Sequence, residues 1–460
     1  MATGQRFYAP NSILATGNWY KISILESGVY KVEVPFLNSL GISGSIPSDQ
    51  LRIFTRLDGM LPESNAVTRI DDLKEIAIDV EDGGDGVLNG QDYILFYAAG
   101  PDYWLKDSSN KRFIHQKNLY SDKVYLYITI GGNGLRIPSL LFNTPPSLTV
   151  TSYDERFAHE LDSVNFLTSG KEWFGEEISN IPGRKSTQEF SLPYNDFSGP
   201  ATIISNVAAR SINVAANLSV TIGGQAIQQL SIPATSNGLY DLFAQEKQKQ
   251  DQFVITPGTS TIAFNYLQGS ANSQCWINWF EFFARRNLSF VQGKQLTFRD
   301  WTSVGTTSIQ FIINNATQNC SVWDITDAYN VKKIPTTITG NEINFNNDGQ
   351  TLHEYICFSN YLQPSIVGKV ANQNLHNSTE SDLIIITYPG FLTQANRIAA
   401  YHQQNDHLKV VTVTTDQIFN EFSAGIPDPT AIRDFVKMYY DKYKGNWNQS
   451  GKYLLLFGKG

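Results

Sequence analysis

The segment from Ser381 to the end of the chain constrains the fold more than any other stretch. Three short apolar runs without alternation are separated there by stretches with helical spacing, and such runs are typical of strands buried on both faces of a parallel sheet. The strands are expected at residues 382–387, 409–414 and 453–457. Because strands that alternate with helices form crossover units, this segment predicts a parallel, three-layer α/β sheet.

Helices are expected between these strands. One is predicted at residues 393–404, and a shorter helical turn at 418–422 is ended by Gly425. The next helix begins at Asp428 and Pro429, since Asp caps free N–H groups and Pro at the first helical position loses no hydrogen bond. Its apolar residues then follow in one stripe: Ile432, Phe435, Val436, Tyr439 and Tyr440.

Catalytic groups of such sheets lie beyond the carboxyl ends of the strands. The third strand is followed only by Gly458, Lys459 and Gly460, without the Ser or Thr of a phosphate loop. Residues 387–390, after the first strand, lack the glycine pattern of a dinucleotide fold. We therefore expect a site to begin where this sequence ends.

Length and composition place further limits on the protein. A chain of 460 residues is too long for one core, so several domains are expected. The net charge of −8, without a basic cluster longer than a pair, argues against a nucleic-acid partner. No apolar run approaches the ~18 residues that span a bilayer, and residues 1–8 show no signal peptide. Either the protein is cytosolic, or Met1 belongs to a trimmed or partial gene.

The rest of the chain is β-rich, and we divide it by composition. Residues 1–148 predict an N-terminal β-rich domain, in which the alternating runs 20–24 and 30–34 are expected to pair as a hairpin with one wet face. Residues 149–289 carry many short strands with glycine turns, such as Gly223-Gly224, which suggests a β-sandwich. Polar residues 246–252 are expected to form a solvated loop. Residues 290–375 form a third β-rich segment, and residues 376–460 form the α/β domain.

An acidic stretch at residues 81–92 resembles the second half of a calcium loop. Asp85, Asn89 and Asp92 supply oxygen ligands around a glycine turn. However, Glu81 stands at the first position and Gly83 at the third, so two ligands are weak or absent. An acidic, glycine-rich turn is therefore favoured, and no cofactor is predicted, with a structural calcium ion as the alternative.

The cysteines and histidines do not form a recognisable site. Cys275, Cys320 and Cys357 are widely spaced without a Cys-x-x-Cys pair, which predicts core positions and neither a disulfide framework nor a zinc site. Cys357 and His376 could form a catalytic dyad, but Cys357 lies in an apolar strand, where a thiol is inert. His376 precedes the first strand of the α/β sheet, away from the carboxyl ends.

The other histidines and the aromatic residues have structural interpretations as well. His159, next to Glu160 and near Asp162, has no second His at helical spacing and is expected to be structural, whereas His402 and His407 are expected to be solvated. Aromatic residues make up 12 % of the chain. They could line a glycan-binding face, and core and cross-strand pairs explain them equally well.

Short motifs in a consistent order along nearly the whole chain resemble those of a known family. They lie at residues 17–22, 27–31, 92–101, 159–160, 169–176, 322–326, 367–376, 416–425, 431–433 and 453–458. In this order they are similar to the gingipain family of cysteine peptidases, and within it to the sortases of the type IX secretion system. The resemblance implies a mainly β, multidomain protein with sandwich-like domains, followed by the first part of a three-layer α/β domain of the caspase and gingipain type.

The resemblance also implies a function. The sortases within this family are enzymes of the outer membrane and cell surface. They remove C-terminal sorting domains from secreted cargo and join the cargo to lipopolysaccharide. The implied partners are that cargo and other outer-membrane components of the secretion system, and no nucleic acid.

The implied chemistry needs a cysteine thiolate and a histidine base. In the family, the histidine lies in a Gly-His-Gly type motif after a later strand and the cysteine follows a further strand. Neither motif occurs here, so the catalytic residues are expected beyond residue 460, and no residue of this sequence is assigned as catalytic, cofactor-binding or metal-binding. Lys459 also departs from the acidic residue expected at its position.

Two other functions are compatible with the residues. One is a non-catalytic surface-binding or adhesion protein, whose β domains hold a glycan or protein partner. The other is an ordinary secreted endopeptidase of the same family. The sequence beyond Gly460 would distinguish them.

Overall fold

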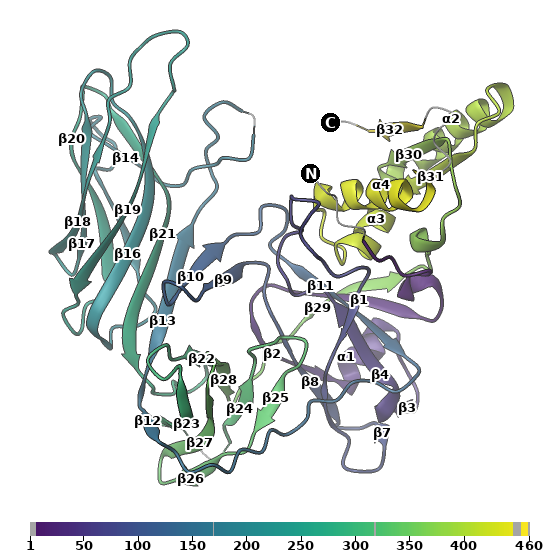
Figure 1. The fold of residues 1–460 in the computed structure, drawn as a ribbon, viewed down its shortest axis with the longest axis horizontal. Helices are drawn as coiled ribbons and strands as arrows, with labels where there is room; N and C mark the ends of the chain where they lie inside the picture. The colour runs from purple at the N-terminus through teal and green to yellow at the C-terminus, as the bar shows by residue number, and fades with distance from the viewer. Residues whose placement is uncertain (1–5, 169, 317–318, 445–451, 459–460) are drawn as a thin grey trace.

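The computed structural model describes residues 6–168, 170–316, 319–444 and 452–458. Figure 1 shows a β-sandwich on one side of the molecule and an α/β unit on the other, joined by smaller sheets below. The fold is mainly β with a C-terminal parallel sheet flanked by helices, which confirms the expected fold class. No helix in the described ranges is long and apolar enough to cross a membrane.

The first segment is built from two sheets that enclose one apolar core. One sheet has the order β29 (Ser365–Val370), β1 (Trp19–Ile24), β11 (Val124–Ile130), β4 (Leu51–Thr55) and β5 (Lys74–Ile76). The other has the order β2 (Gly28–Glu33), β8 (Tyr93–Ala98) and β6 (Asp79–Glu81). Short elements complete it: η1 (Ile13–Ala15), α1 (Val34–Leu40), β3 (Ile46–Pro47), η2 (Ser48–Gln50) and β7 (Val87–Leu88).

The predicted hairpin between residues 20–24 and 30–34 is wrong. β1 pairs with β11 and β29, whereas β2 pairs with β8, so the two strands belong to different sheets. Their apolar residues, such as Ile22 and Val32, face the same core from opposite sides. Alternation shows that one face of a strand is buried, but it does not show which strand lies beside it.

Residues 149–289 contain the expected sandwich of two antiparallel sheets. One sheet has the order β13 (Ser152–Glu160), β21 (Gln274–Asn287), β16 (Phe197–Arg210) and β19 (Gln245–Val254), with β14 (Glu177–Ser179) beside β21. The other has the order β15 (Thr187–Ser191), β20 (Thr261–Gln268), β17 (Ala216–Ile222) and β18 (Gln225–Ile232). Gly223 and Gly224 both have positive φ in the turn between β17 and β18.

The solvated loop predicted at residues 246–252 is also wrong, because these residues lie within β19. Their backbone groups pair with β16 over the length of the strand. β19 is the last strand on its side of the sheet, and its side chains are exposed or half-buried. An edge strand of this kind needs little apolar alternation, because backbone hydrogen bonds to its neighbour hold it in place.

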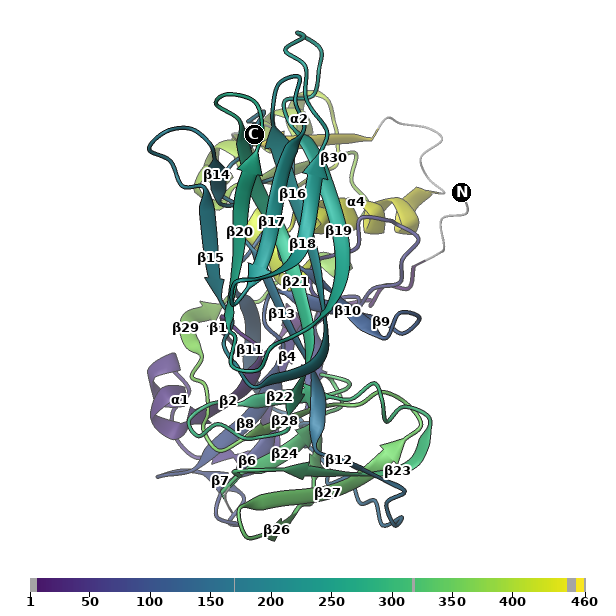
Figure 2. The same ribbon diagram turned by 90° about the vertical axis from the view of Figure 1, so that its left-hand side faces the viewer.

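The third segment forms two further sheets around its own core (Figure 2). One sheet has the order β12 (Leu148–Val150), β23 (Thr306–Ile313), β27 (Glu342–Gly349) and β26 (Thr337–Thr339). The other has the order β22 (Leu296–Arg299), β28 (Glu354–Phe358), β24 (Ser321–Asp324) and β25 (Lys332–Ile334). β29 then returns to the sheet of the first segment. A separate hairpin, β9 (Tyr103–Asp107) and β10 (Arg112–Gln116), lies against the sandwich.

The C-terminal unit is the predicted α/β arrangement. Its parallel sheet has the order β31 (Val410–Thr414), β30 (Leu383–Thr387) and β32 (Tyr453–Phe457), with η3 (Leu375–Asn377), η4 (Pro389–Phe391), α2 (Leu392–Asn405), α3 (Thr415–Phe422) and α4 (Pro429–Tyr443). Ile385 packs on α2, and Ile386 on the opposite face packs with α3 and α4. Three layers result, with β30 buried on both faces.

Local signals explain where these helices begin. Thr414 and Gln417 form a reciprocal capping box at the start of α3. The Asp428 carboxylate accepts the Thr430 N–H at 2.8 Å at the start of α4, with Pro429 at its first position. Gly425 has φ +87° after α3, and a Cβ there would collide with the Lys21 ammonium group. Glycine therefore lets the first segment approach α3 closely.

Candidate functional site

The carboxyl edge of the parallel sheet is where the chemistry of this fold would lie. Thr387 is in register with Thr414 on one side and Phe457 on the other, so the three strands end together. The described residues that directly follow these ends are Tyr388, Thr415 and Gly458. None of these three is a cysteine or a histidine, so they do not supply a nucleophile and its base.

Aromatic side chains cover part of this edge. Tyr388 and Phe391 are 61 % and 42 % exposed. The ring centroids of Phe391 and Phe457 are 6.1 Å apart. The described part of the edge is thus an apolar surface that carries neither a thiol nor an imidazole.

All three cysteines lie in β cores. Cys275 and Cys357 are 0 % exposed, and Cys320 is 6 % exposed. Burial raises the pKa of the Cys275 thiol, and the hydrogen bond with Cys320, together with burial, raises the pKa of Cys357 well above its ordinary value. Buried, protonated thiols of this kind are poor nucleophiles.

His376 lies beneath α3 and between two carboxylates. Its Nδ1 is 2.6 Å from Glu421 Oε2 and its Nε2 is 3.1 Å from Asp71 Oδ1. Burial by itself lowers the pKa of His376, but the hydrogen bonds to Asp71 and Glu421 outweigh it and raise the pKa from 6.5 to about 9. Both ring nitrogens therefore donate, and this histidine is an imidazolium cation that cannot serve as a general base at neutral pH.

Glu421, on α3, is the central acceptor of this cluster. Its side chain is fully buried. Besides the His376 ring, it accepts the backbone N–H groups of Leu375 and His376 at 2.8 and 3.1 Å, and the amide of Gln373 at 2.9 Å. A buried carboxylate with this many donors is well compensated. It holds η3, and thereby the entry to β30, against α3.

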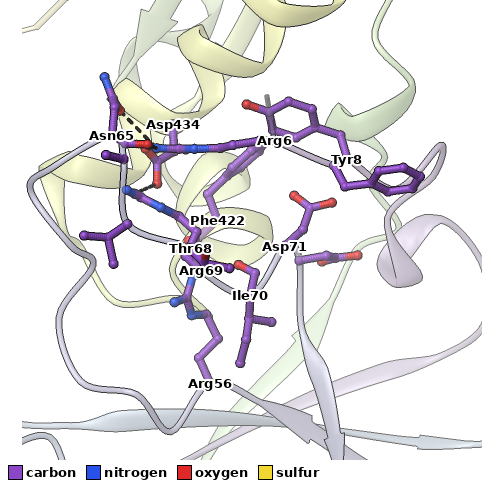
Figure 3. Close-up of a pocket in the computed structure, with 14 residues that line it drawn as sticks. Arg6, Tyr8, Arg56, Asn65, Thr68, Arg69, Ile70, Asp71, Phe422 and Asp434 are labelled. Carbon is purple, nitrogen blue, oxygen red and sulfur yellow. Dashed lines mark hydrogen bonds and ion pairs between the residues drawn. The ribbon is translucent and has the colours of Figure 1, made fainter. Parts of the chain in front are cut away.

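A second cluster surrounds Asp434 on α4. Figure 3 shows Arg6 and Arg69 converging on this carboxylate, whose side chain is 4 % exposed. Arg6 Nη1 donates to it at 3.0 Å, Arg69 donates to its other oxygen, and Arg433 Nη2 lies at 3.1 Å. Arg6 and Arg69 come from the first segment, so the buried carboxylate ties that segment to α4.

Together these residues form what we call the interdomain clamp: Arg6, Arg69, Asp71, His376, Glu421 and Asp434. Four of them, Arg6, Arg69, Asp71 and Asp434, line a pocket of about 310 Å³. Arg56, Asp72 and Phe422 line it as well. Burial raises the pKa of Asp72 to about 6, although the Ile13 N–H that it accepts opposes this. Because the charged groups of the clamp already compensate one another, its chemistry is structural, and it fixes the β-rich part against the start of the α/β unit.

Several of the remaining histidines pair with carboxylates. His159 Nε2 lies 2.9 Å from Glu176 Oε1, and His402 Nδ1 lies 2.6 Å from Asp406 Oδ2 near the exposed end of α2. His407 is exposed. Sequence reasoning missed the clamp and also His115, whose ring lies 3.7 Å from both Asp102 and Glu160. No local spacing signals such contacts, since their partners come from distant parts of the chain.

The acidic stretch at residues 81–92 consists of largely exposed turns on either side of the short strand β7, and its carboxylates accept hydrogen bonds from nearby backbone N–H groups. Asp82 accepts the Gly84 N–H at 2.9 Å, Asp85 accepts the Val87 N–H at 2.9 Å, and Asp92 accepts the Asn89 N–H at 2.8 Å. Within the described ranges no group of three or more acidic, His or Cys residues is arranged to hold a metal ion.

We therefore expect that calcium does not raise the melting temperature of the protein. Calcium that bound only the folded state would raise it by mass action. Differential scanning fluorimetry with calcium and then with a chelator measures the effect. A chelator-reversible increase that Asp85→Ala abolishes would contradict the expectation.

Comparison with known proteins supports the α/β interpretation. Residues 376–460 match the profile of peptidase family C25. No sequence among curated proteins matches the chain.

Solved structures extend the comparison to the whole chain. The protein is similar to the crystal structure of dimeric latent PorU from Porphyromonas gingivalis, with a TM-score of 0.83 and 26 % identity over 98 % of this chain. The match spans 42 % of the length of that PorU chain.

Two carbohydrate-binding modules match a smaller part of the chain. Module CBM36 in complex with calcium and xylotriose has a TM-score of 0.18 and 10 % identity, covering 29 % of this chain and 99 % of its own. A family 35 module from Clostridium thermocellum has a TM-score of 0.17 and 11 % identity, covering 28 % and 90 %. These two likenesses support no conclusion about this chain. The protein is thus similar to PorU over almost its whole described sequence, and its residues 376–460 carry the beginning of a peptidase family C25 domain.

Proposed function

We propose that this chain is the N-terminal part of a type IX secretion system sortase, a gingipain-like cysteine peptidase and transpeptidase. Such an enzyme removes C-terminal sorting domains from secreted cargo at the cell surface. The observation that carries the proposal is the similarity to PorU over 98 % of this chain, together with the family C25 match at residues 376–460.

The proposal includes a location, partners and a domain division. The protein would act at the outer membrane and cell surface, with secreted cargo and other outer-membrane components of the secretion system as partners. We keep the division into residues 1–148, 149–289, 290–375 and 376–460 as part of the proposal. The interdomain clamp supports a role in which the β-rich part holds the first strands of the peptidase domain in place.

The chemistry would be completed by residues beyond position 460. A thiol is only a few per cent ionised at neutral pH, so a cysteine nucleophile needs a histidine within hydrogen-bond reach. Both groups must stand above the carboxyl ends of the strands, where Thr387, Thr414 and Phe457 end the described part of the sheet. Cys275, Cys320 and Cys357 are buried elsewhere and do not meet this requirement.

We expect that the 460-residue chain has no peptidase or transpeptidase activity, whereas the full-length gene product cleaves cargo. The downstream sequence should encode a histidine between glycines and then a cysteine after a later strand. Mutation of that cysteine to alanine should leave cargo with an uncleaved sorting domain, as measured by the mass of surface-extracted cargo. The matched control is Cys320→Ala in the full-length protein, which should preserve cleavage if the protein folds.

Two outcomes would contradict this expectation. A downstream sequence without such a histidine and cysteine would favour a non-catalytic surface-binding protein. Cleavage by the 460-residue chain that thiol alkylation abolishes would show that one of its buried cysteines reacts.

A further inference from the structure

A groove separates the β9–β10 hairpin from the outer face of the sandwich sheet. Figure 1 shows the hairpin beside β13, near the middle of the molecule. Arg112 Nη1 on the hairpin donates to Gln250 Oε1 on β19 at 2.9 Å, and Glu281 on β21 accepts the His115 N–H at 2.6 Å. A cavity of about 570 Å³ lies beside the Arg112–Gln250 contact, and both of these residues line it. This volume falls in the range of small-ligand sites, which is roughly 300–1,000 Å³.

The floor of this groove is set by strand register. Thr202 on β16 lies opposite Gln252 on β19 and opposite Phe283 on β21, and Phe283 in turn lies opposite Arg156 on β13. Thus a hydroxyl, an amide and a half-buried aromatic ring are neighbours on one face of the sheet. The same three residues line the cavity.

Most charged groups around the groove already have partners, whereas Lys111 in the turn of the hairpin is exposed at its rim. Arg156 Nη2 is 2.9 Å from Glu354, Arg285 Nη1 is 3.0 Å from Asp154, and Arg112 Nε is 3.3 Å from Asp107. A free anion would have to compete with these carboxylates, and a cation would have to compete with the guanidinium groups. The groups left to meet a ligand are therefore mainly uncharged.

Two buried donors in the lining point to a ligand that offers acceptors. Trp301 is 7 % exposed, and its Nε1 has no hydrogen-bond partner in the described chain. Arg156 Nη1 also lacks one. Buried donors without acceptors are unfavourable. Hydroxyl oxygens that enter the groove can offset this cost without adding charge.

We propose that this groove binds a neutral saccharide. The amide and hydroxyl of Gln252 and Thr202 both donate and accept, as sugar hydroxyls do, while the apolar ring face of Phe283 can pack against the C–H face of a sugar ring. The site does not depend on peptidase chemistry, so its failure would leave the proposed function unaffected.

The test uses the 460-residue chain and neutral tetrasaccharides of glucose, mannose and galactose as probes in isothermal titration calorimetry. At least one probe is expected to bind. The double variant Thr202→Val and Gln252→Ala should weaken its Kd about tenfold or more, since two hydrogen-bonding groups are lost while the β-branched shape at position 202 is kept. Phe283→Ala should weaken binding further. The matched control is Gln225→Ala, an exposed glutamine on β18 of the other sheet, with no expected change.

Circular dichroism and melting temperatures establish that each variant is folded. If Phe283→Ala does not fold, the double variant alone decides. Absence of binding to all three tetrasaccharides would overturn the proposal, as would equal affinity of the double variant and the parent chain. Binding of a neutral tetrapeptide in the groove without saccharide binding would assign the groove to peptides and overturn it as well.

Discussion

Replacement of Asp434 with alanine is expected to lower the free energy of unfolding of the C-terminal unit by about 3–5 kcal/mol. Asp434 is 3 % exposed and receives Arg6, Arg69 and Arg433. The substitution would leave these guanidinium groups without their shared carboxylate in a largely buried setting. Removing one partner of such a cluster costs more than the net contribution of an intact pair, because the remaining charges stay desolvated.

Urea unfolding combined with limited proteolysis of the region after Asn374 would measure this effect. The control is Asp406→Ala, which removes a half-exposed partner of His402 near the end of α2 and should cost about 1 kcal/mol or less. An Asp434→Ala protein as stable as the Asp406→Ala protein would show that the clamp does not hold the two parts together.

The stability contributed by His376 is expected to disappear as the pH rises from about 6.5 to about 9. Its pKa is raised from 6.5 to about 9 in the folded protein, so the native state holds a proton that the unfolded chain releases in this interval. The contribution is fully present below the unfolded pKa and is lost as the pH passes through the folded pKa. A shift of this size corresponds to about 3 kcal/mol.

Other groups titrate in the same pH range, so the contribution of His376 must be measured as the difference in unfolding free energy between the parent protein and a variant without this histidine. The pKa of His115 also rises to about 9, while burial lowers the pKa of Lys21 to about 8, which favours the folded state as the pH rises further. Asp72, with its pKa raised to about 6, reduces stability in a lower interval, as the pH rises from about 4 to about 6. Unfolding free energies of the parent and of His376→Gln should therefore be compared at each pH.

The two proteins should differ most below about pH 6.5 and converge above about pH 9. His402→Gln provides the control, because this side chain lies near the exposed end of α2 and its Nδ1 is paired with the half-exposed carboxylate of Asp406. Its difference from the parent should be small across the whole interval. A His376→Gln difference that stays constant with pH would show that His376 is not held as an imidazolium.

Local patterns predicted the elements whose signals lie within a few residues. The apolar run of β30 marked a strand buried on both faces, and the Asp428-Pro429 pair marked the start of α4. Both predictions depend on hydrophobicity and capping, which act over one or two turns. In contrast, residues 246–252 have no strand pattern, and β19 forms because β16 offers it backbone partners.

Three features could be predicted from the amino-acid sequence: the order of strands and helices after Ser381, the β-rich character of the preceding segments, and the core positions of the three cysteines. These follow from the spacing of apolar residues along the chain. Other features depend on long-range packing: β1 and β2 lie in different sheets, β29 returns to the first sheet, and Arg6 contacts Asp434, 428 positions away in the chain. The clamp and the groove belong to this second group, because their geometry depends on which distant surfaces pack together, and no local propensity encodes that choice.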